Sequence, residues 1–192
     1  MLVDIVSLRI PGSFTVSNRS HVDERGHFVE WFRSDLIREH TGLSFHTTQA
    51  NLSVSAQGSL RGIHFADVPP GQAKYVMCVV GSIRDYVVDI RVGSSTFGQW
   101  DAVTISAAER NAVLLDVGLG HAFVALEPET VVTYLVTDHY KPHAEHAINP
   151  LDPEIALDFP FGRDELLVSP KDLEAPNLAE ALQQGMLPRW EE

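Results

Sequence analysis

Apolar residues in this chain occur in short runs, and turn-forming residues separate one run from the next. Glycine, proline, asparagine or aspartate fills most of the gaps, as at Pro11-Gly12 and Pro69-Pro70-Gly71. Many short strands with turns between them favour an all-β sandwich, jelly roll or barrel, and no strand–helix alternation indicates a parallel α/β fold. We expect strands near 14–17, 28–32, 46–54, 59–66, 74–80, 83–91, 97–105, 112–116, 121–126 and 130–137.

Helix is expected only in short segments with recognisable caps. Ser34 is suited to cap one helix that Gly42 would end. A Ser-x-x-Glu capping box starting at Ser106 predicts a single helical turn. Asn177 is suited to cap a third helix, with Glu180 at its third position and a glycine at its end. The three segments are 34–40, 106–111 and 178–184.

The predicted strand 83–91 places two carboxylates on one of its faces. Side chains alternate between the faces of a strand, so Asp85 and Asp89 share a face with Arg91. This arrangement indicates either a polar cavity or a salt-bridge ladder with Arg91, and the alternation alone leaves both open.

The segment 49–74 reads as a hairpin rich in groups that can do chemistry. An imidazole beside fixed positive charge, with amides to orient a polar ligand, suits proton abstraction next to a carbonyl. Arg61 and His64 are three residues apart, so a regular strand would point them to opposite faces. We therefore expect a bulge at Gly62, or a role for one of the two at another surface such as a subunit interface. The groups belong to Gln49, Asn51, Arg61, His64 and Lys74.

Composition limits the class of protein. The 192 residues are 44% hydrophobic and 21% charged, which fits one globular domain over 1–192, with a core at about 20–140 and a proline-rich segment, 141–192, wrapped around it. The net charge of 14 − 26 = −12 argues against nucleic acid as a partner. The absence of a long apolar run or a basic leader indicates a cytoplasmic protein without membrane contact. A lone Cys78 excludes an intrachain disulfide and a multi-cysteine zinc site.

Several sequence blocks, in a fixed order from about residue 20 to 175, carry a resemblance to a known family. The chain resembles the dTDP-4-dehydrorhamnose 3,5-epimerase family, and in particular the epimerases of antibiotic deoxysugar pathways. The blocks are DERGHFVEWF (23–32), QANLSVS (49–55), GSLRGIHF (58–65), GQAKYVMCVVGSIRDYVVDIRVGSSTFGQW (71–100), GLGHAF (118–123), TYLVTDHYKPHAEHAI (133–148), NPLDPEIALDFP (149–160) and LLVSPKD (166–172).

The resemblance implies a cupin-like jelly-roll barrel and an isomerase that needs neither cofactor nor metal. The implied substrate is a nucleoside-diphosphate 4-keto-6-deoxyhexose, with dTDP as the expected nucleotide. Loss of a hydrogen from C3 or C5 would give an enolate spread onto the C4 carbonyl, and return of a proton to the opposite face would invert that carbon. The resemblance also implies a homodimer.

Four residues receive catalytic roles from the resemblance. His64 would be the base, and Asp172 would orient its ring and favour the imidazolium. Lys74 would stabilise the enolate oxygen, and Tyr134 would return a proton from the opposite face.

The remaining matched positions are implied substrate contacts. Arg25 and Glu30 belong to an element that reaches the ligand across a dimer interface in the family. Arg61 is suited to a diphosphate because its planar fork donates two hydrogen bonds. The other implied contacts are Gln49, Asn51, His121, Glu145 and Lys171.

The chain departs from the family pattern at Ala66, Asp116 and Ala122. We expect these positions to lie near the sugar, where they would bear on which carbon is inverted. Three alternatives remain open: a metal-dependent cupin with His64 and His121 as ligands, a non-catalytic sugar-nucleotide-binding protein on the same fold, and a ketoisomerase-like relative that moves the carbonyl.

Overall fold

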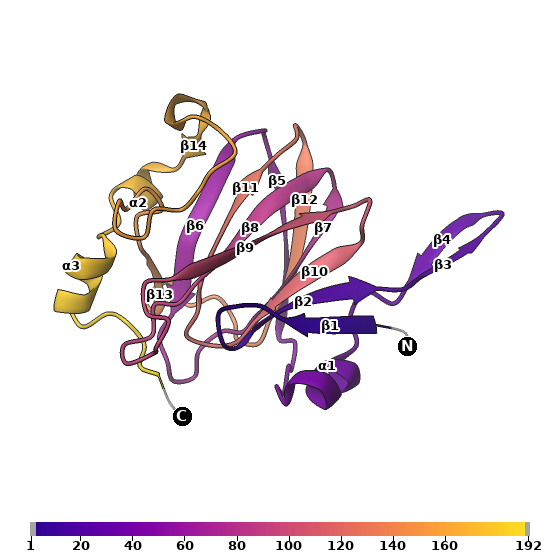
Figure 1. The fold of residues 1–192 in the computed structure, drawn as a ribbon, viewed down its shortest axis with the longest axis horizontal. Helices are drawn as coiled ribbons and strands as arrows, with labels where there is room; N and C mark the ends of the chain where they lie inside the picture. Colours follow the sequence, from indigo (N-terminus) through magenta and orange to yellow (C-terminus); the bar gives the residue numbers. More distant parts are fainter. Residues whose placement is uncertain (1–2, 191–192) are drawn as a thin grey trace.

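The computed structural model describes residues 3–190, and two antiparallel sheets packed face to face form most of it (Figure 1). The first sheet contains, in spatial order, β1 (Val3–Ser7), β2 (Ser13–Asn18), β10 (Asn111–Leu115), β7 (Lys74–Val80), β12 (Thr130–Val136) and β5 (Gln49–Ser55). The second sheet contains β13 (Glu145–Ala147), β6 (Ser59–Ala66), β11 (Gly120–Ala125), β8 (Ser82–Val88) and β9 (Trp100–Ser106), and β14 (Leu167–Val168) pairs in parallel with β6. Successive strands from β5 to β8, and from β10 to β12, alternate between the sheets, as in a jelly roll. The expected all-β, cupin-like fold is confirmed.

Three layers of buried apolar side chains hold the sheets. The middle layer lies between them and contains Val76 and Phe123. An outer layer packs α1 (Ser34–Thr41) against the first sheet through Ile37 and Tyr75. The other outer layer packs the segment after residue 147 against the second sheet, with Ile148 among its members. Each sheet is covered on both faces. The central strands, β7 in the first sheet and β11 in the second, are therefore apolar almost throughout and do not alternate between apolar and polar residues.

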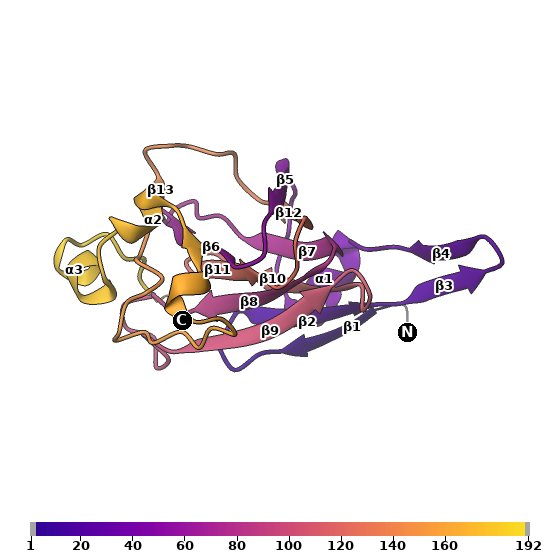
Figure 2. The same ribbon diagram turned by 90° about the horizontal axis from the view of Figure 1, so that it is seen from above.

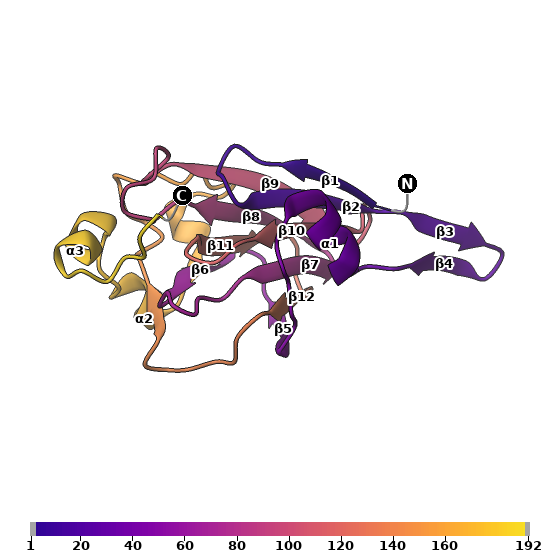
Figure 3. The same cartoon turned by 90° about the horizontal axis from the view of Figure 1, so that it is seen from below.

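The C-terminal segment packs on the second sheet. It contains the 3-10 turn η1 (Arg163–Glu165), α2 (Pro170–Leu173) and α3 (Leu178–Gln183), drawn in gold in Figure 1. At the other end of the molecule, the hairpin of β3 (Ser20–Asp23) and β4 (Gly26–Val29) extends away from both sheets. Figures 2 and 3 show the same extension from above and below.

Two of the helix predictions need correction. Ser34 is the first helical residue of α1 rather than its cap; Arg33 occupies the cap position without a side-chain capping bond. Gly42 does end that helix, in a left-handed conformation. The segment 106–111 is a tight turn, not a helix: the Glu109 N–H donates to Ser106 Oγ at 3.1 Å, and Asn111 already begins β10. The capping box of α3 is confirmed.

The sequence missed four strands. β1, β3, β13 and β14 were not predicted, and the predicted strands 83–91 and 97–105 are each shorter at the end where they approach one another. The missed strands are short or half exposed, so their side chains lack the apolar pattern that marks a central strand.

Within residues 3–190 no helix has the length and apolar character needed to cross a membrane.

Candidate active site

A cavity of about 470 Å³ opens between the two sheets and collects most of the sequence-predicted site residues. The first sheet supplies its wall from β5, β7 and β12, and the second from β6, β11 and β13. The lining residues are Gln49, Asn51, Ser53, Arg61, His64, Gln72, Lys74, His121, Phe123, Tyr134, Tyr140, Glu145, His146 and Lys171.

A bulge in β6 brings Arg61 and His64 to the same cavity. His64 lies opposite His121 on β11, whereas Arg61 lies opposite Phe123, so β6 has one residue more than its partner over this stretch. Gly62 sits in the bulge with φ +123, and a Cβ there would lie 2.5 Å from the His121 carbonyl oxygen. Only glycine suits both the backbone angle and the close approach of β11. The predicted bulge is confirmed.

His64 and Asp172 form a hydrogen-bonded pair at the cavity wall. His64 Nε2 lies 2.8 Å from Asp172 Oδ1, with the imidazole 40% exposed and the carboxylate 5% exposed. A carboxylate only accepts, so Nε2–H donates and Nδ1 is left as the basic nitrogen. Ser169 caps α2 by accepting from the Asp172 N–H at 3.1 Å, which fixes the position of the carboxylate. Burial opposes ionisation of Asp172, but hydrogen bonds from His64, Ser169 and Gly62 outweigh it and hold its pKa below the usual value.

Lys74 and Tyr134 face the cavity from the first sheet. Burial lowers the pKa of the Lys74 ammonium to about 8, although Glu145 acts in the opposite direction. Burial also raises the pKa of Tyr134, and Glu145 adds to that rise while Arg61 opposes it. At neutral pH the phenol therefore carries its proton and can donate it.

His121 forms a second pair with a carboxylate. Its Nε2 lies 2.7 Å from Asp85 Oδ2, and burial raises the pKa of Asp85 while His121 opposes that rise. Asp89, in contrast, pairs with Arg91 at 2.8 Å outside the cavity. Of the two outcomes left open by the alternation along 83–91, the ion pair with Arg91 occurs for Asp89, whereas Asp85 is buried behind His121 and does not itself line the cavity. Among residues 3–190 no group of three or more His, Cys, Asp or Glu side chains is arranged to hold a metal ion.

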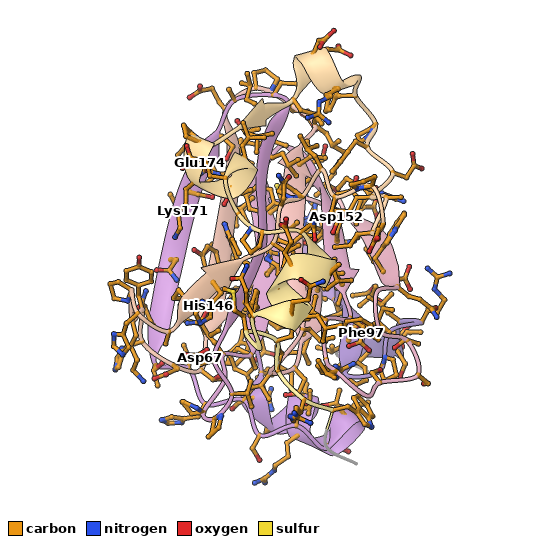
Figure 4. The ribbon with its side chains drawn as sticks, turned by 90° about the vertical axis from the view of Figure 1, so that its left-hand side faces the viewer. Asp67, Phe97, His146, Asp152, Lys171 and Glu174 are labelled. Carbon is orange, nitrogen blue, oxygen red and sulfur yellow. The ribbon has the colours of Figure 1, made fainter. Side chains whose placement is uncertain are left out.

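Amide and charged groups complete the cavity wall. Gln49 Nε2 donates to Asn51 Oδ1 at 2.8 Å, and Gln49 Oε1 accepts from the Tyr140 N–H at 3.0 Å, so both amides are held in place. Arg61 Nε donates to Ser55 Oγ at 3.1 Å. Figure 4 shows Lys171, at the start of α2, on the same side of the molecule as His146.

Arg25 and Glu30 lie apart from this cavity within one chain. Arg25 is exposed at the turn of the β3–β4 hairpin and pairs with Asp23 at 2.5 Å. Glu30 pairs with Arg33 at 3.5 Å. Neither residue lines the cavity. Their predicted contact with a ligand would need a second chain.

The sequence missed several residues of the cavity wall. Ser53 follows Gln49 and Asn51 at the same two-residue spacing on β5, and Gln72 has that spacing from Lys74, so alternation could have found both. Phe123 also has that spacing from His121 on β11, but a buried aromatic residue is common in any β-rich core, and Tyr140 lies outside the strands where alternation applies. Asp85 reaches the site only through His121, which pairing between β8 and β11 brings within reach.

None of the three departures from the family pattern lines the cavity, and their expected position near the sugar stays a prediction. Ala122 is buried in the layer on the outer face of the second sheet, because its side chain points away from that of His121. Ala66 lines a neighbouring pocket of about 250 Å³. Asp116 lies against Gly12, in a turn after β10.

Comparison with known proteins gives one family for this chain. The model of the dTDP-4-dehydrorhamnose 3,5-epimerase family matches residues 7–180. A dTDP-4-dehydrorhamnose 3,5-epimerase from Mycolicibacterium smegmatis is 48% identical over 183 residues, covering 95% of this chain and 90% of that protein. A dTDP-4-dehydro-6-deoxyglucose 3-epimerase from a Streptomyces species is 43% identical over 184 residues, covering 96% and 93%.

Solved structures agree as well. NovW, a 4-keto-6-deoxy sugar epimerase from the novobiocin gene cluster of Streptomyces spheroides, superimposes with a TM-score of 0.94 at 45% identity, covering 98% of this chain and 94% of that one. ChmJ, a 3'-monoepimerase from Streptomyces bikiniensis in complex with dTDP-quinovose, gives a TM-score of 0.90 at 44% identity, covering 95% and 91%. The chain belongs to the dTDP-4-dehydrorhamnose 3,5-epimerase family.

Proposed function

We propose that this protein is an epimerase of a dTDP-linked 4-keto-6-deoxyhexose and that it inverts C3, C5 or both without a cofactor. The observation that carries the proposal is the position of His64 and Tyr134. They face one cavity from opposite sheets, with the Lys74 ammonium beside them. The relatives named above are all epimerases, so neither a metal-dependent cupin, nor a non-catalytic binding protein, nor a ketoisomerase is favoured.

The first step is proton abstraction by His64. The C–H next to the C4 carbonyl is acidic because the electron pair left behind spreads onto the carbonyl oxygen. Nδ1 of His64 takes the proton, and the imidazolium formed is stabilised by the Asp172 carboxylate at Nε2. Asp172 keeps its negative charge at neutral pH because its pKa lies below the usual value.

The enolate formed in this step needs a cation near its oxygen. Lys74 is buried in the cavity wall, where water screens its charge little and its interaction with an oxyanion is strong. The proton that is returned to the carbon comes from Tyr134, on the side of the sugar ring opposite to His64. Two groups on opposite faces are required for inversion, because one base that returned its own proton would restore the starting configuration.

Local positive charge accounts for binding of an anionic substrate by an acidic protein. The chain has a net charge of −12, yet Arg61, Lys74 and Lys171 all line the cavity. Arg61 and Lys171 are suited to the diphosphate, and Gln49, Asn51, His121 and Glu145 to the polar groups of the sugar and base.

We also propose that the protein is a homodimer in which the β3–β4 hairpin carries Arg25 and Glu30 to the partner's cavity. The hairpin extends away from its own sheets (Figure 2). Its side chains Val22 and Phe28 are 67% and 66% exposed, and large apolar side chains on an extended element favour a contact with another chain.

The test of the enzymatic proposal is incubation with dTDP-4-keto-6-deoxyglucose in heavy water, followed by NMR. We expect deuterium at C3, C5 or both, and accumulation of the epimer at each carbon that is inverted. Absence of any exchange of carbon-bound hydrogen would contradict the proposal. Movement of the carbonyl to another carbon would instead identify a ketoisomerase.

A further inference from the structure

Gln72 is a cavity residue that none of the proposed catalytic steps uses. It lies in the loop before β7, two residues from Lys74, and its side-chain oxygen accepts a hydrogen bond from Lys74 Nζ. Its side-chain nitrogen donates to Glu145 Oε1 at 3.1 Å and to the Asp138 carbonyl oxygen at 3.3 Å. The amide thus stands between the ammonium of Lys74 and the carboxylate of Glu145.

The orientation of this amide is fixed by its partners. An ammonium group only donates and a carboxylate only accepts, so the oxygen of Gln72 must face Lys74 and the nitrogen must face Glu145. Lys74 is 6% exposed, and a buried ammonium group is costly unless its protons find acceptors. A neutral amide meets that need without adding a charge, and it leaves the remaining ammonium protons free for an oxyanion in the cavity.

We propose that Gln72 is a positioning residue for Lys74. Its side-chain amide lies between Lys74 and Glu145, prevents direct contact between the two charges, and so directs the ammonium into the cavity. Direct contact between Lys74 and Glu145 would hold the ammonium at the cavity wall. The catalytic consequence of this role rests on the proposed epimerase function, whereas its effect on the titration of Lys74 does not.

Other charged and titratable groups line the same cavity as Lys74, and they are unchanged in both Gln72 variants. They are Glu145 and His146 from β13, Tyr134 from β12, Tyr140 from the loop after β12, Arg61 and His64 from β6, His121 from β11, and Lys171 from α2.

Two substitutions at Gln72 should change the titration of Lys74 in opposite directions. Gln72→Met removes an acceptor from the charged form, so the Lys74 pKa should fall. Gln72→Glu places an anion against the ammonium, so the pKa should rise. A hydrogen bond to a charged group corresponds to a shift of about one pH unit in each case. A residue that only filled space would not give shifts of opposite sign.

The chain offers a direct measurement because Lys74, Lys141 and Lys171 are its only lysines. NMR of the free protein labelled with 13C at the lysine Cε would follow each amine through a pH titration, with Lys141→Arg and Lys171→Arg used to assign the signals. Gln57→Met is a matched control, since Gln57 donates only to the Leu126 carbonyl oxygen in a surface turn. The control should leave the Lys74 midpoint unchanged.

Turnover supplies the second readout. With dTDP-4-keto-6-deoxyglucose as substrate, both Gln72 variants should lose about tenfold in kcat with KM within a factor of about three, because the interaction forms mainly with the enolate oxygen. The alkaline limb of the pH profile of kcat/KM should move to lower pH for Gln72→Met and to higher pH for Gln72→Glu.

Equal Lys74 midpoints in the wild type and both variants, or shifts in one direction only, would overturn the proposal. If Gln72→Met fails to fold, Gln72→Ala, which also removes the acceptor, takes its place, and the Lys74 pKa should again fall. A wild type that titrates as expected but does not epimerise would contradict only the proposed function.

Discussion

His64 and His121 each pair with a carboxylate, and the surroundings shift the pKa values of the two carboxylates in opposite directions. Asp172 accepts hydrogen bonds from several donors, which together hold its pKa below the usual value despite burial. Asp85 is fully enclosed behind His121, and there burial prevails and raises its pKa. The half-exposed His64 beside an ionised partner is the better candidate for accepting a proton, while His121 stays a candidate substrate contact.

The His64→Asn variant should lose about 10²–10⁴-fold in kcat/KM, because it removes the general base while keeping a polar side chain of similar size. Steady-state kinetics with dTDP-4-keto-6-deoxyglucose would measure the loss, and circular dichroism would check the fold. His46→Asn is the control, since His46 is exposed outside the cavity. Turnover near the wild-type rate would show that another group is the base.

Tyr134→Phe should separate exchange from inversion. The variant keeps the base, so a C–H next to the carbonyl should still exchange with heavy water, but a proton can no longer be delivered from the face opposite His64. NMR should therefore show deuterium uptake with inversion lost at one carbon. Unchanged product stereochemistry would remove Tyr134 from the mechanism.

At the scale of single elements, the bulge of β6 decides whether the site exists. A strand of uniform alternation would carry Arg61 and His64 to opposite faces, and the additional residue at Gly62 corrects this. The cost is a backbone conformation reserved for glycine and a contact with β11 that leaves no room for a side chain.

Gly62→Ala should therefore destabilise the protein by more than about 3 kcal/mol, the upper end of the usual cost of backbone strain alone. The added Cβ would lie 2.5 Å from the His121 carbonyl oxygen and 2.6 Å from the Ala122 Cα. Gly26→Ala is a matched control: Gly26 has φ +128, but a Cβ added there would have no atom within 4 Å of it. Urea unfolding should show the smaller loss for Gly26→Ala, and equal losses would mean that packing against β11 contributes nothing.

At the scale of the whole molecule, Arg91 joins segments that are far apart in the sequence. It pairs with the buried Asp89 at 2.8 Å, donates to the Pro11 carbonyl oxygen at 2.8 Å, and lies 4.3 Å from the centre of the Trp190 ring. The N-terminal loop, the end of β8 and the C-terminal segment therefore meet at one guanidinium group. Removing it would leave a buried carboxylate without its partner.

Arg91→Met should cost about 3–5 kcal/mol of unfolding free energy at pH 7. Burial opposes ionisation of Asp89, but Arg91, Ser94 and Thr96 together hold its pKa below the usual value. A carboxylate with a lowered pKa stabilises the fold above its unfolded pKa of about 4, and this contribution disappears as the pH falls through the folded value. The difference between wild type and variant in urea unfolding should therefore shrink below about pH 4. A difference independent of pH would assign the loss to packing against Trp190 instead.

The proposed dimer can be tested by mixing two inactive variants. Arg25→Ala lacks the residue offered to a partner, and His64→Asn lacks the base of its own cavity. If each cavity uses Arg25 of the other chain, a mixed dimer has one complete cavity, so unfolding and refolding the two together should restore roughly a quarter of the sites. Light scattering should give the mass of two chains. A stable monomer, or no recovery of activity, would contradict the role assigned to Arg25.

The sequence by itself determined the strand-rich fold, its central strands and most of the cavity wall. β6 and β7 have the predicted bounds, because apolar runs bordered by turn residues depend on local chemistry. The resemblance to a family added Asp172 and Lys171, which lie about a hundred residues from His64 and could not be placed beside it by any local pattern.

Only the tertiary structure decided which groups meet and in what state. The Gln72 bridge, the Asp85–His121 pair and the separate fates of Asp85 and Asp89 depend on pairing between distant strands. The same is true of Ala66, Asp116 and Ala122, which the fold leaves out of the cavity lining. Alternation tells which residues share a face of one strand, but burial and contacts across two sheets fix the charge and direction of a side chain, and these arise only when the sheets close over one another.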